Sequence, residues 1–352
     1  MSYTKIAKEK FEVLRHKKDV IILSIESSCD ETAVAIVKNG REVLANVVSS
    51  QIEIHRRFGG VVPEVASRNH ILAISNLYEE ALKEANLKAE DLDAIAVTYG
   101  AGLMGALLVG VNFAKGLAYS LNLPLVAVSH VEGHISANYI SHIDLKPPFV
   151  CLMVSGGHTA LLKISGYTKH KLLGSTVDDA VGESFDKVAR VLGLPYPGGP
   201  EIDKLAKTGE NNIKFVVSNS LSKTLNFSFS GIKTAVINYV HNKTQKNEGF
   251  SKADVARSFE ECVTDELVTK SIRACKATGI NKLVVAGGVG ANSMLREKLS
   301  TSGKENGVEI YYPVLKYCTD NAAMIGSMAY YYILDKIGLA GLDLTAKPNV
   351  NL

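Results

Sequence analysis

Residues 21–37 read IILSIESSCDETAVAIV, which is an apolar run, a polar segment and a second apolar run. This pattern predicts two short strands joined by the polar residues 26–32. Residues 149–164, FVCLMVSGGHTALLKI, have the same shape. The recurrence predicts two related domains, each placing the turn of its hairpin in a cleft.

Strand-like runs alternate with helical stretches along the chain, for example at residues 105–121 and 252–279, which predicts an α/β fold. A further apolar run, Lys282–Ala286, precedes the segment GGVGAN and a helix from about Ser293, with Asn292 as a candidate N-cap. Backbone amides of glycine turns can approach a phosphate closely. Such turns also occur in purely structural roles, but several in one chain favour a nucleotide-like ligand.

The composition is that of an ordinary globular protein with room for two domains in 352 residues. The net charge of +3, from 39 basic and 36 acidic residues, is too small to indicate nucleic-acid binding by itself. No apolar run approaches the roughly eighteen residues of a membrane helix, so we expect no membrane partner. Five scattered cysteines without C-x-x-C spacing argue against a zinc ribbon or disulfide framework and favour the cytoplasm. Residues 1–19 are basic, lack the apolar core of a secretory signal, and are predicted to be a solvated amphipathic extension.

Two histidines with four-residue spacing, His130 and His134, follow the strand-like run Leu123–Val128. Four residues is about one helical turn, so both imidazoles can face one point. In open α/β sheets, ligands bind at the carboxyl ends of strands. The pair therefore predicts a site for a first-row metal ion, given a third ligand from elsewhere in the chain.

Asp320 is the best candidate for that third ligand, because it stands just before an apolar helix of small residues, 322–334. An aspartate at a helix start can instead be the N-cap, and this alternative stays open. A zinc protease would need His-Glu-x-x-His. Here the glutamate is Glu132, at the third position, which a helix places about 200° from His130 and away from the metal.

Residues 100–105, GAGLMG, match the dinucleotide-binding pattern after the strand-like run 94–98. The pattern also needs an acidic residue at the end of the next strand, and that strand ends at Val128 and Ser129 without one. We therefore do not expect a hydride-transfer cofactor. A second group of acidic residues is the run of Asp178, Asp179, Glu183 and Asp186. The spacing of Asp179, Glu183 and Asp186 predicts that these three share one face of a helix. They form either a solvated face relieved by Lys187 and Arg190 or acceptors for ribose hydroxyls or an amine.

Seven segments together resemble the Kae/TsaD family, over about residues 19–334: ESSCDET (26–32), GGVVPE (59–64), HVEGH (130–134), VSGGHT (154–159), FSFSGIKT (227–234), AGGV (286–289) and CTDN (318–321). The resemblance implies an actin/Hsp70/sugar-kinase-like (ASKHA) fold with duplicated RNase H-like domains around a cleft. We expect an N-terminal extension at 1–19, a first domain at 20–129 with a helix near 322–340, and a second domain at 130–321 that carries the metal and nucleotide sites.

The resemblance also implies transfer of a threonylcarbamoyl group from threonylcarbamoyl-AMP to N6 of the adenosine just 3′ of the anticodon, in tRNAs reading ANN codons. The implied partners are TsaB and TsaE, and a homodimer is a further possibility when TsaB is absent. One divalent ion, Fe²⁺ or Zn²⁺, is implied at His130, His134 and Asp320. The implied substrate-binding residues are Met153, Val154, Ser155, Gly156, Gly157, Asp186, Gly199, Asp203 and Asn292.

Glu31, on the first hairpin turn, is the candidate catalytic acid that orients the substrate or moves a proton. The alternative is that Glu31 only keeps the turn soluble. Two positions depart from the family. Met153 stands where archaeal and eukaryotic relatives have a metal-binding tyrosine, which implies three protein ligands and open positions on the ion, and Ala101 replaces the usual proline of its turn. A small-molecule kinase, which would hold Mg²⁺ with carboxylates, and a non-catalytic nucleotide-binding scaffold are the remaining alternatives.

Overall fold

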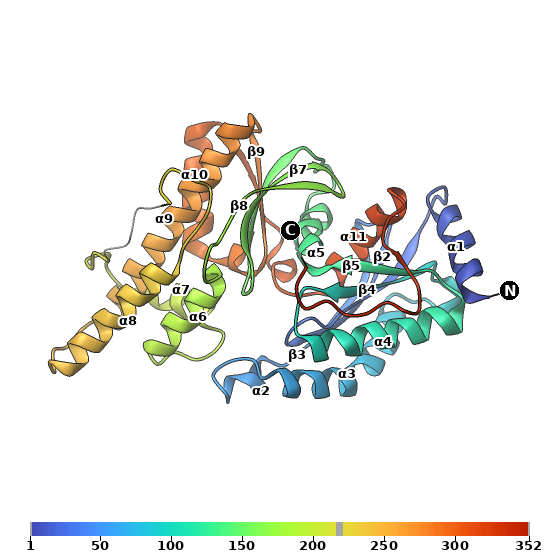
Figure 1. Cartoon of the computed structure of the whole chain (residues 1–352), viewed down its shortest axis with the longest axis horizontal. Helices are drawn as coiled ribbons and strands as arrows, with labels where there is room; N and C mark the ends of the chain where they lie inside the picture. Colours follow the sequence, from blue (N-terminus) through green and yellow to red (C-terminus); the bar gives the residue numbers. More distant parts are fainter. Residues whose placement is uncertain (1, 216–220, 351–352) are drawn as a thin grey trace. The chain divides into compact units, whose positions relative to one another are not determined.

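The structure, a computed structural model, describes residues 2–215 and 221–350. The chain forms two compact units, shown in Figure 1. Met1–Leu145 and Pro313–Leu352 make up the first unit, and Lys146–Tyr312 makes up the second. The first unit is therefore built from two separate parts of the sequence.

The first unit contains a sheet in the order β11-β5-β4-β1-β2-β3. The predicted hairpin is present: β1 (Ile21–Glu26) pairs antiparallel with β2 (Glu31–Lys38), which pairs antiparallel with β3 (Glu42–Ser50). On the other side of β1, β4 (Ala94–Gly100) and then β5 (Leu125–Ser129) run parallel to it, and the short β11 (Leu339–Ala340) closes the edge. The carboxyl ends of the three parallel strands β1, β4 and β5 consequently lie along one edge of this sheet.

Helices cover both faces of the first sheet. Strand residues alternate between faces, so Leu23 and Ile25 pack in one core with residues of α3 (Pro63–Glu84) and α4 (Met104–Leu121). Ser24, between them, donates a hydrogen bond to the carbonyl of Ala322 at the start of α11 (Ala322–Leu334) on the opposite face. The short α2 (Ile52–Arg56) follows β3.

Helix α4 is long and apolar enough, by length and composition, to cross a membrane, so the expectation that no segment approaches a membrane helix is wrong. One of its faces is buried in the core of the first unit: Ala106, Leu107, Gly110, Val111, Ala114 and Ala118. Helices of this kind are common in the cores of soluble proteins, and a single one is weak evidence for a membrane span.

The N-terminal segment forms α1 (Tyr3–Leu14), which is amphipathic as predicted but is not solvated on all sides. Tyr3, Ala7, Phe11 and Leu14 are buried, and the Tyr3 hydroxyl donates a hydrogen bond to the carbonyl of Leu123. These residues recur at helical spacing, so a single stripe of the helix packs against the first unit. The expectation of a solvated extension is therefore wrong for residues 3–14, while Met1 lies outside the described residues.

The second unit repeats the strand pattern of the first, in the order β10-β9-β6-β7-β8. Strand β6 (Phe149–Val154) pairs antiparallel with β7 (Thr159–Gly166), and β7 pairs with β8 (Lys169–Ser175). Strand β9 (Lys282–Ala286) is parallel to β6, and β10 (Glu309–Tyr311) is parallel to β9. The predicted duplication of an α/β hairpin unit is thus present in both sheets.

The helices of the second unit are α6 (Val181–Val191), α7 (Gly198–Ala206), α8 (Ser230–Gln245), α9 (Lys252–Thr278) and α10 (Ser293–Asn306). Helix α9 lies along the core of the unit, with Val255, Phe259, Val263 and Leu267 buried among residues of β6 and β9. The predicted helix 252–279 is confirmed to within one residue. Gly279 adopts the left-handed conformation and ends the helix.

The unit boundaries differ from the expected domain boundary at residue 130. Helix α5 (His130–Ser141) and Asp320 both belong to the first unit. The physical reason is packing: the Ser136 hydroxyl of α5 donates a hydrogen bond to the carbonyl of Met324 in α11, and α11 lies on the sheet of the first unit. All three expected metal ligands therefore come from one compact unit.

Candidate metal centre

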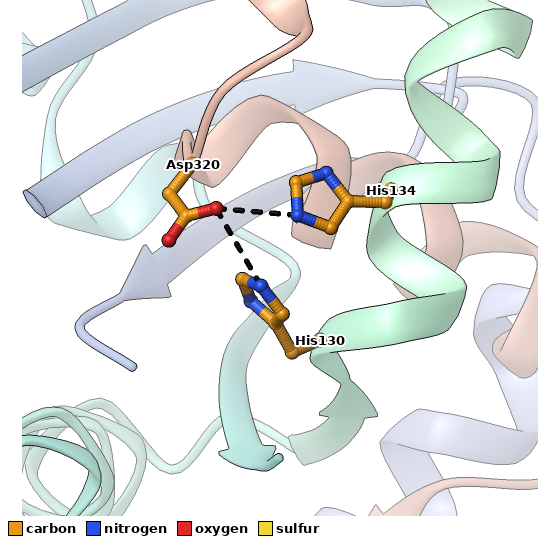
Figure 2. A group of neighbouring side chains, drawn as sticks. All are labelled: His130, His134 and Asp320. Atoms are coloured by element: carbon orange, nitrogen blue, oxygen red, sulfur yellow. Dashed lines mark ion pairs between the residues drawn. The ribbon is translucent and has the colours of Figure 1, made fainter. Parts of the chain in front are cut away.

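Three side chains meet at the carboxyl end of β5 (Figure 2). The strand ends at Ser129, and α5 begins at once with His130, so His130 and His134 lie one turn apart on the same face. Oδ1 of Asp320 lies 3.5 Å from Nε2 of His130 and 3.2 Å from Nε2 of His134. The ligand atoms of the three residues all lie within 4.8 Å of one another, so the group could hold a metal ion.

Asp320 does not cap α11, although it stands directly before the helix. The N-cap is Asn321, whose side chain accepts a hydrogen bond of 3.1 Å from the backbone amide of Met324. The neighbouring asparagine thus satisfies the helix end and leaves the Asp320 carboxylate directed at the two imidazoles. Of the two readings of Asp320, the capping role is wrong.

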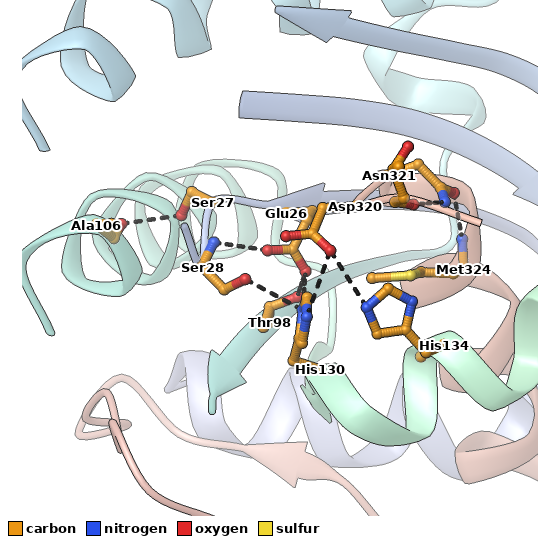
Figure 3. A network of polar contacts seen from close by, with 12 residues as sticks. Glu26, Ser27, Ser28, Thr98, Ala106, His130, His134, Asp320, Asn321 and Met324 are labelled. Carbon is orange, nitrogen blue, oxygen red and sulfur yellow. Dashed lines mark hydrogen bonds and ion pairs between the residues drawn. The ribbon is translucent and has the colours of Figure 1, made fainter. Parts of the chain in front are cut away.

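A buried carboxylate orients His130 from behind (Figure 3). Oε2 of Glu26 lies 3.1 Å from Nδ1 of His130, and the Ser28 hydroxyl lies at the same distance. Glu26 is itself fixed, because it accepts hydrogen bonds of 2.6 Å from the Ser28 amide and from the Thr98 hydroxyl. When Nδ1 carries its proton toward Glu26, Nε2 is left as the metal-binding nitrogen.

The charges within the site compensate one another. Burial would lower the pKa of His130, but Asp320 and Glu26 raise it to about 9. Burial would raise the pKa of Asp320, but His130 and His134 lower it to about 2. The two carboxylates therefore create a field that favours a positive charge at this place, and an imidazolium supplies it in the protein alone.

The donor set fits a transition-metal ion. Two imidazole nitrogens and one carboxylate oxygen match the ligands that zinc and ferrous iron accept. Nδ1 of His134 is buried and makes no hydrogen bond with the described residues. A metal ion among these three side chains would replace the imidazolium as the positive charge that balances Asp320 and Glu26.

Glu31 begins β2 and lies close enough to Asp320 to be affected by its charge. Burial, Asp320 and Asp30 together raise the pKa of Glu31 to about 10, so the carboxyl group keeps its proton at neutral pH in the protein alone. The Ser50 hydroxyl donates a hydrogen bond of 3.1 Å to Oε1 of Glu31. Burial and the same carboxylates raise the pKa of the Cys29 thiol well above its usual value.

Glu132 takes no part in the group of ligands. Its carboxylate accepts a hydrogen bond from the hydroxyl of Tyr332 on α11. This contact agrees with the expectation that Glu132 turns away from the metal, and it leaves the site without the general base of a zinc protease.

The residues expected to bind the nucleotide-like substrate all lie in the second unit, where the turn after β6 is open. Ser155 and His158 hold the two ends of this turn together. The Ser155 amide donates a hydrogen bond to the His158 carbonyl, and the Ser155 hydroxyl accepts one from the His158 amide. A Cβ atom on Gly156 or Gly157 would meet nothing within 4 Å, so open space lies before both glycines. Met153 and Val154, by contrast, are fully buried in β6.

The remaining four expected residues are connected through α7. Asp186 accepts a hydrogen bond of 2.7 Å from the amide of Gly198, next to Gly199 at the helix start. Asp203, later in α7, accepts hydrogen bonds from the amide and hydroxyl of Ser293, the neighbour of Asn292. The structure thus brings Asp186, Gly199, Asp203 and Asn292 into one hydrogen-bonded region.

The other acidic residues of 178–186 have structural partners. Asp178 accepts hydrogen bonds from the hydroxyls of Ser228 and Ser230, and Asp179 forms ion pairs with Lys187 and Lys233. Asp179 precedes α6, so the predicted shared helical face with Glu183 and Asp186 is wrong. Relief of the acidic charge by Lys187 is confirmed, because Lys187 also pairs with Glu183.

Sequence reasoning missed two buried carboxyl groups, Glu26 and Glu260. Glu26 falls within the ESSCDET segment, where a glutamate directly after a buried strand could have been marked as a site residue. Glu260 lies in the middle of α9 and is 1% exposed, and no local pattern distinguishes it from a surface glutamate of a long helix.

Known structures share the fold. Component A of (R)-2-hydroxyglutaryl-CoA dehydratase from Acidaminococcus fermentans matches with a TM-score of 0.54 at 16% identity, over 89% of this chain and 99% of that one. HypF from T. kodakarensis matches with a TM-score of 0.63 at 15% identity, over 91% of this chain and 48% of that one. These likenesses show the fold alone, and that fold is the expected two-sheet ASKHA class.

The sequence comparisons are more specific. The family model of TsaD, tRNA N6-adenosine threonylcarbamoyltransferase, matches residues 42–327. Proteins of that description are 58% identical in Clostridium perfringens, over 94% of this chain and 98% of the relative, and 57% identical in Clostridium novyi, over 95% and 98%. A third, from Clostridium botulinum, is 56% identical over 96% and 99%. With identity at this level over nearly its whole length, the chain belongs to the TsaD family, and it is a tRNA N6-adenosine threonylcarbamoyltransferase.

Proposed function

We propose that this enzyme takes the threonylcarbamoyl group from threonylcarbamoyl-AMP and transfers it to N6 of the adenosine just 3′ of the anticodon, in tRNAs reading ANN codons. The amine nitrogen forms a bond to the carbamoyl carbon, the bond from that carbon to the phosphate oxygen breaks, AMP leaves, and the amine loses a proton. The observation that carries the proposal is the His130–His134–Asp320 group in a chain of this family.

In this proposal the second unit binds the AMP part of the donor. Gly156 and Gly157 offer backbone amides to the phosphate, and the open space before both glycines leaves room for it. Asp186 and Asp203 are acceptors suited to ribose hydroxyls, and Asn292 offers an amide. The Gly287–Gly288 turn adds amides next to Val154, since a Cβ atom on Gly287 would meet the Val154 carbonyl oxygen at 2.5 Å.

In this proposal His130, His134 and Asp320 of the first unit would hold the metal ion, Fe²⁺ or Zn²⁺. When bound, such an ion supplies a Lewis acid that polarises a carbonyl or phosphoryl oxygen. Glu26 keeps the His130 ring in the orientation and tautomer that binding requires. A set of three protein ligands would leave room for further ligands on such an ion.

We assign to Glu31 the role of a catalytic acid that orients the substrate or moves a proton. Its position beside Asp320 and its raised pKa of about 10 in the protein alone support a group that can hold a proton at this site. A role limited to keeping the turn soluble fits less well, because burial is the largest cause of that raised pKa.

We further propose that the enzyme works with TsaB and TsaE in the cytoplasm, and that it forms a homodimer when TsaB is absent. The net charge of +3 supports a shared grip on tRNA, because a single protein with a small net charge gains little from the phosphate backbone.

The first experiment measures threonylcarbamoyl transfer to unmodified tRNA by the purified chain with TsaB, TsaE and threonylcarbamoyl-AMP. His130→Ala is compared with wild type, and His16→Ala, which changes an exposed histidine of the N-terminal segment, is the matched control. We expect transfer by wild type and His16→Ala, and none by His130→Ala. Absence of transfer by all three, with metal and partners verified, would overturn the proposal.

A further inference from the structure

The carboxyl group of Glu260 is buried beneath two of the residues proposed to bind the donor. Glu260 lies on α9 and is 1% exposed, so it cannot itself reach a substrate in solvent. Nδ2 of Asn292 donates a hydrogen bond of 2.5 Å to its Oε1 atom. Burial of an ionisable group costs free energy unless the group is hydrogen-bonded or paired. The partners of Glu260 therefore indicate its role.

Asn292 is held at both ends of its amide. Its Oδ1 atom accepts a hydrogen bond of 2.8 Å from the amide of Leu295 and thereby caps α10. Its Nδ2 group is directed at Glu260. Because one end accepts and the other donates, the amide has a single orientation, and one hydrogen of Nδ2 remains for another acceptor.

Asp203 is the second partner. Its Oδ1 atom accepts hydrogen bonds of 2.9 and 2.6 Å from the amide and hydroxyl of Ser293, and Oδ2 lies 3.1 Å from Nζ of Lys207. Asp203 also lies close enough to Glu260 for its charge to raise the pKa of Glu260. The start of α10 therefore contacts both carboxyl groups, Glu260 on α9 through Asn292 and Asp203 on α7 through Ser293.

The two carboxyl groups differ in how readily they take up a proton. Burial, followed by Asp203, raises the pKa of Glu260 to about 7, against the opposing effects of Asn292 and Arg257. Ser293 and Lys207 hold the pKa of Asp203 below its usual value despite burial. Two neighbouring carboxylates cannot both be ionised at low cost, so Glu260 is the one that takes up a proton as the pH falls below about 7.

We propose that Glu260 is a positioning residue, which fixes Asn292 and Asp203 in the orientations that bind the nucleoside part of the donor. This inference rests on the proposed function, in which Asp203 and Asn292 contact that donor. The charged groups around Glu260 are Asp203 and Lys207 from α7 and Arg257 from α9, while α10 presents the uncharged Asn292 and Ser293. Ionisation of Glu260 repels Asp203, so nucleotide affinity should decrease as the pH rises above about 7.

The test compares Glu260→Ala and Glu260→Gln with wild type. Glutamine keeps an oxygen for Asn292 and an N–H donor for Asp203, so it mimics the protonated glutamate at every pH. Asp265→Asn, which changes an exposed carboxylate of the same helix, is the control. Two quantities are measured at pH 6.5 and 8.5: the Kd of AMP by calorimetry, and kcat and KM of the transfer reaction with threonylcarbamoyl-AMP.

For Glu260→Ala we expect Kd and KM at least tenfold above wild type, with kcat changed less than threefold. For Glu260→Gln we expect Kd and KM within threefold of the wild-type values at pH 6.5. Both should be the same for this variant at pH 8.5, whereas the wild-type Kd and KM should rise at least threefold between pH 6.5 and 8.5. If Glu260→Ala does not fold, the loss of pH dependence in Glu260→Gln still decides the question. Wild-type values for Glu260→Ala, or the same pH dependence in wild type and Glu260→Gln, overturn the inference.

The same measurements separate this inference from the proposed function. Unchanged AMP binding in Glu260→Ala, in an enzyme that transfers normally, overturns the role of Glu260 alone. AMP binding that depends on Glu260, in an enzyme that transfers nothing, overturns the proposed function alone. Failure of wild type both to bind AMP at any pH and to transfer the threonylcarbamoyl group overturns both.

Discussion

Glu26 and His130 form a buried pair in which Oε2 of the carboxylate lies 3.1 Å from Nδ1 of the imidazole. The ring nitrogen that remains, Nε2, lies on the side of Asp320 and His134. His130 would therefore touch a metal ion, whereas Glu26 would only orient its ring. Mutation of a ligand and mutation of Glu26 should change metal affinity to different extents.

Glu26→Gln should lower the affinity for the metal ion by about 10- to 100-fold while all three ligands remain. Glutamine can still accept from Nδ1, but its neutral amide no longer favours a positive charge beside the ring. The affinity is measured by competition with a chromophoric chelator, and Glu42→Gln, at an exposed position of β3, should bind like wild type. An unchanged affinity in Glu26→Gln would show that the carboxylate does not tune the site.

Glu31→Gln should reduce kcat by about 10²- to 10⁴-fold, the range typical of a lost proton-transfer group. The metal content should stay at the wild-type level, because Glu31 is not one of the three ligands. Single-turnover transfer and metal analysis are measured on the same sample, with the exposed Glu53→Gln as control. A wild-type kcat in Glu31→Gln would leave Glu31 as a residue of the turn only.

Gly102→Ala should destabilise the first unit by more than about 2 kcal/mol and weaken metal binding. Gly102 has a φ of +152°, and a Cβ atom there would lie 2.5 Å from the backbone oxygen of Ser28, whose hydroxyl contacts His130. Gly116→Ala on α4 is the matched control, since its Cβ atom meets nothing within 4 Å and alanine favours a helix by about 0.5–1 kcal/mol. Urea unfolding gives the free energy of unfolding of each variant. Equal values for Gly102→Ala and Gly116→Ala would contradict the close approach of Gly102 to Ser28.

Phe11→Ala should lower the free energy of unfolding by about 3 kcal/mol, because a buried aromatic side chain is lost from the face of α1 that packs on the first unit. Phe11 is 3% exposed and Val13, two residues later, is 64% exposed. Val13→Ala should therefore change the free energy of unfolding by less than about 0.5 kcal/mol. If chemical denaturation finds no difference between these variants, α1 is a solvated extension in solution.

The local parts of the fold and site could be predicted from the sequence. Both hairpins follow from apolar runs around polar turns, and the four-residue spacing of His130 and His134 predicts their common face without knowledge of the fold. The stripe of Tyr3, Ala7, Phe11 and Leu14 was also visible, but the surrounding lysines favoured a solvated helix. Burial of that stripe depends on a surface formed by distant residues such as Leu123.

The remaining features depend on contacts between distant parts of the chain. The role of Asp320 could not be separated from helix capping, because Asn321 beside it is an equally good cap and only the fold decides between them. The boundary of the units was placed too early, because the hydrogen bond from Ser136 to Met324 joins segments that no local pattern connects. Glu260 gave no signal, since burial of a central helix residue is decided by what packs against it.

The discontinuity of the first unit sets an order of events during protein synthesis. Ser24 and Gly326 are close neighbours on the face that α11 covers, yet α11 and Asp320 leave the ribosome only after the whole second unit. A nascent chain that has reached residue 312 has both histidines but lacks the carboxylate that completes the group. Metal loading at all three ligands therefore belongs to the finished polypeptide, after the second unit has emerged.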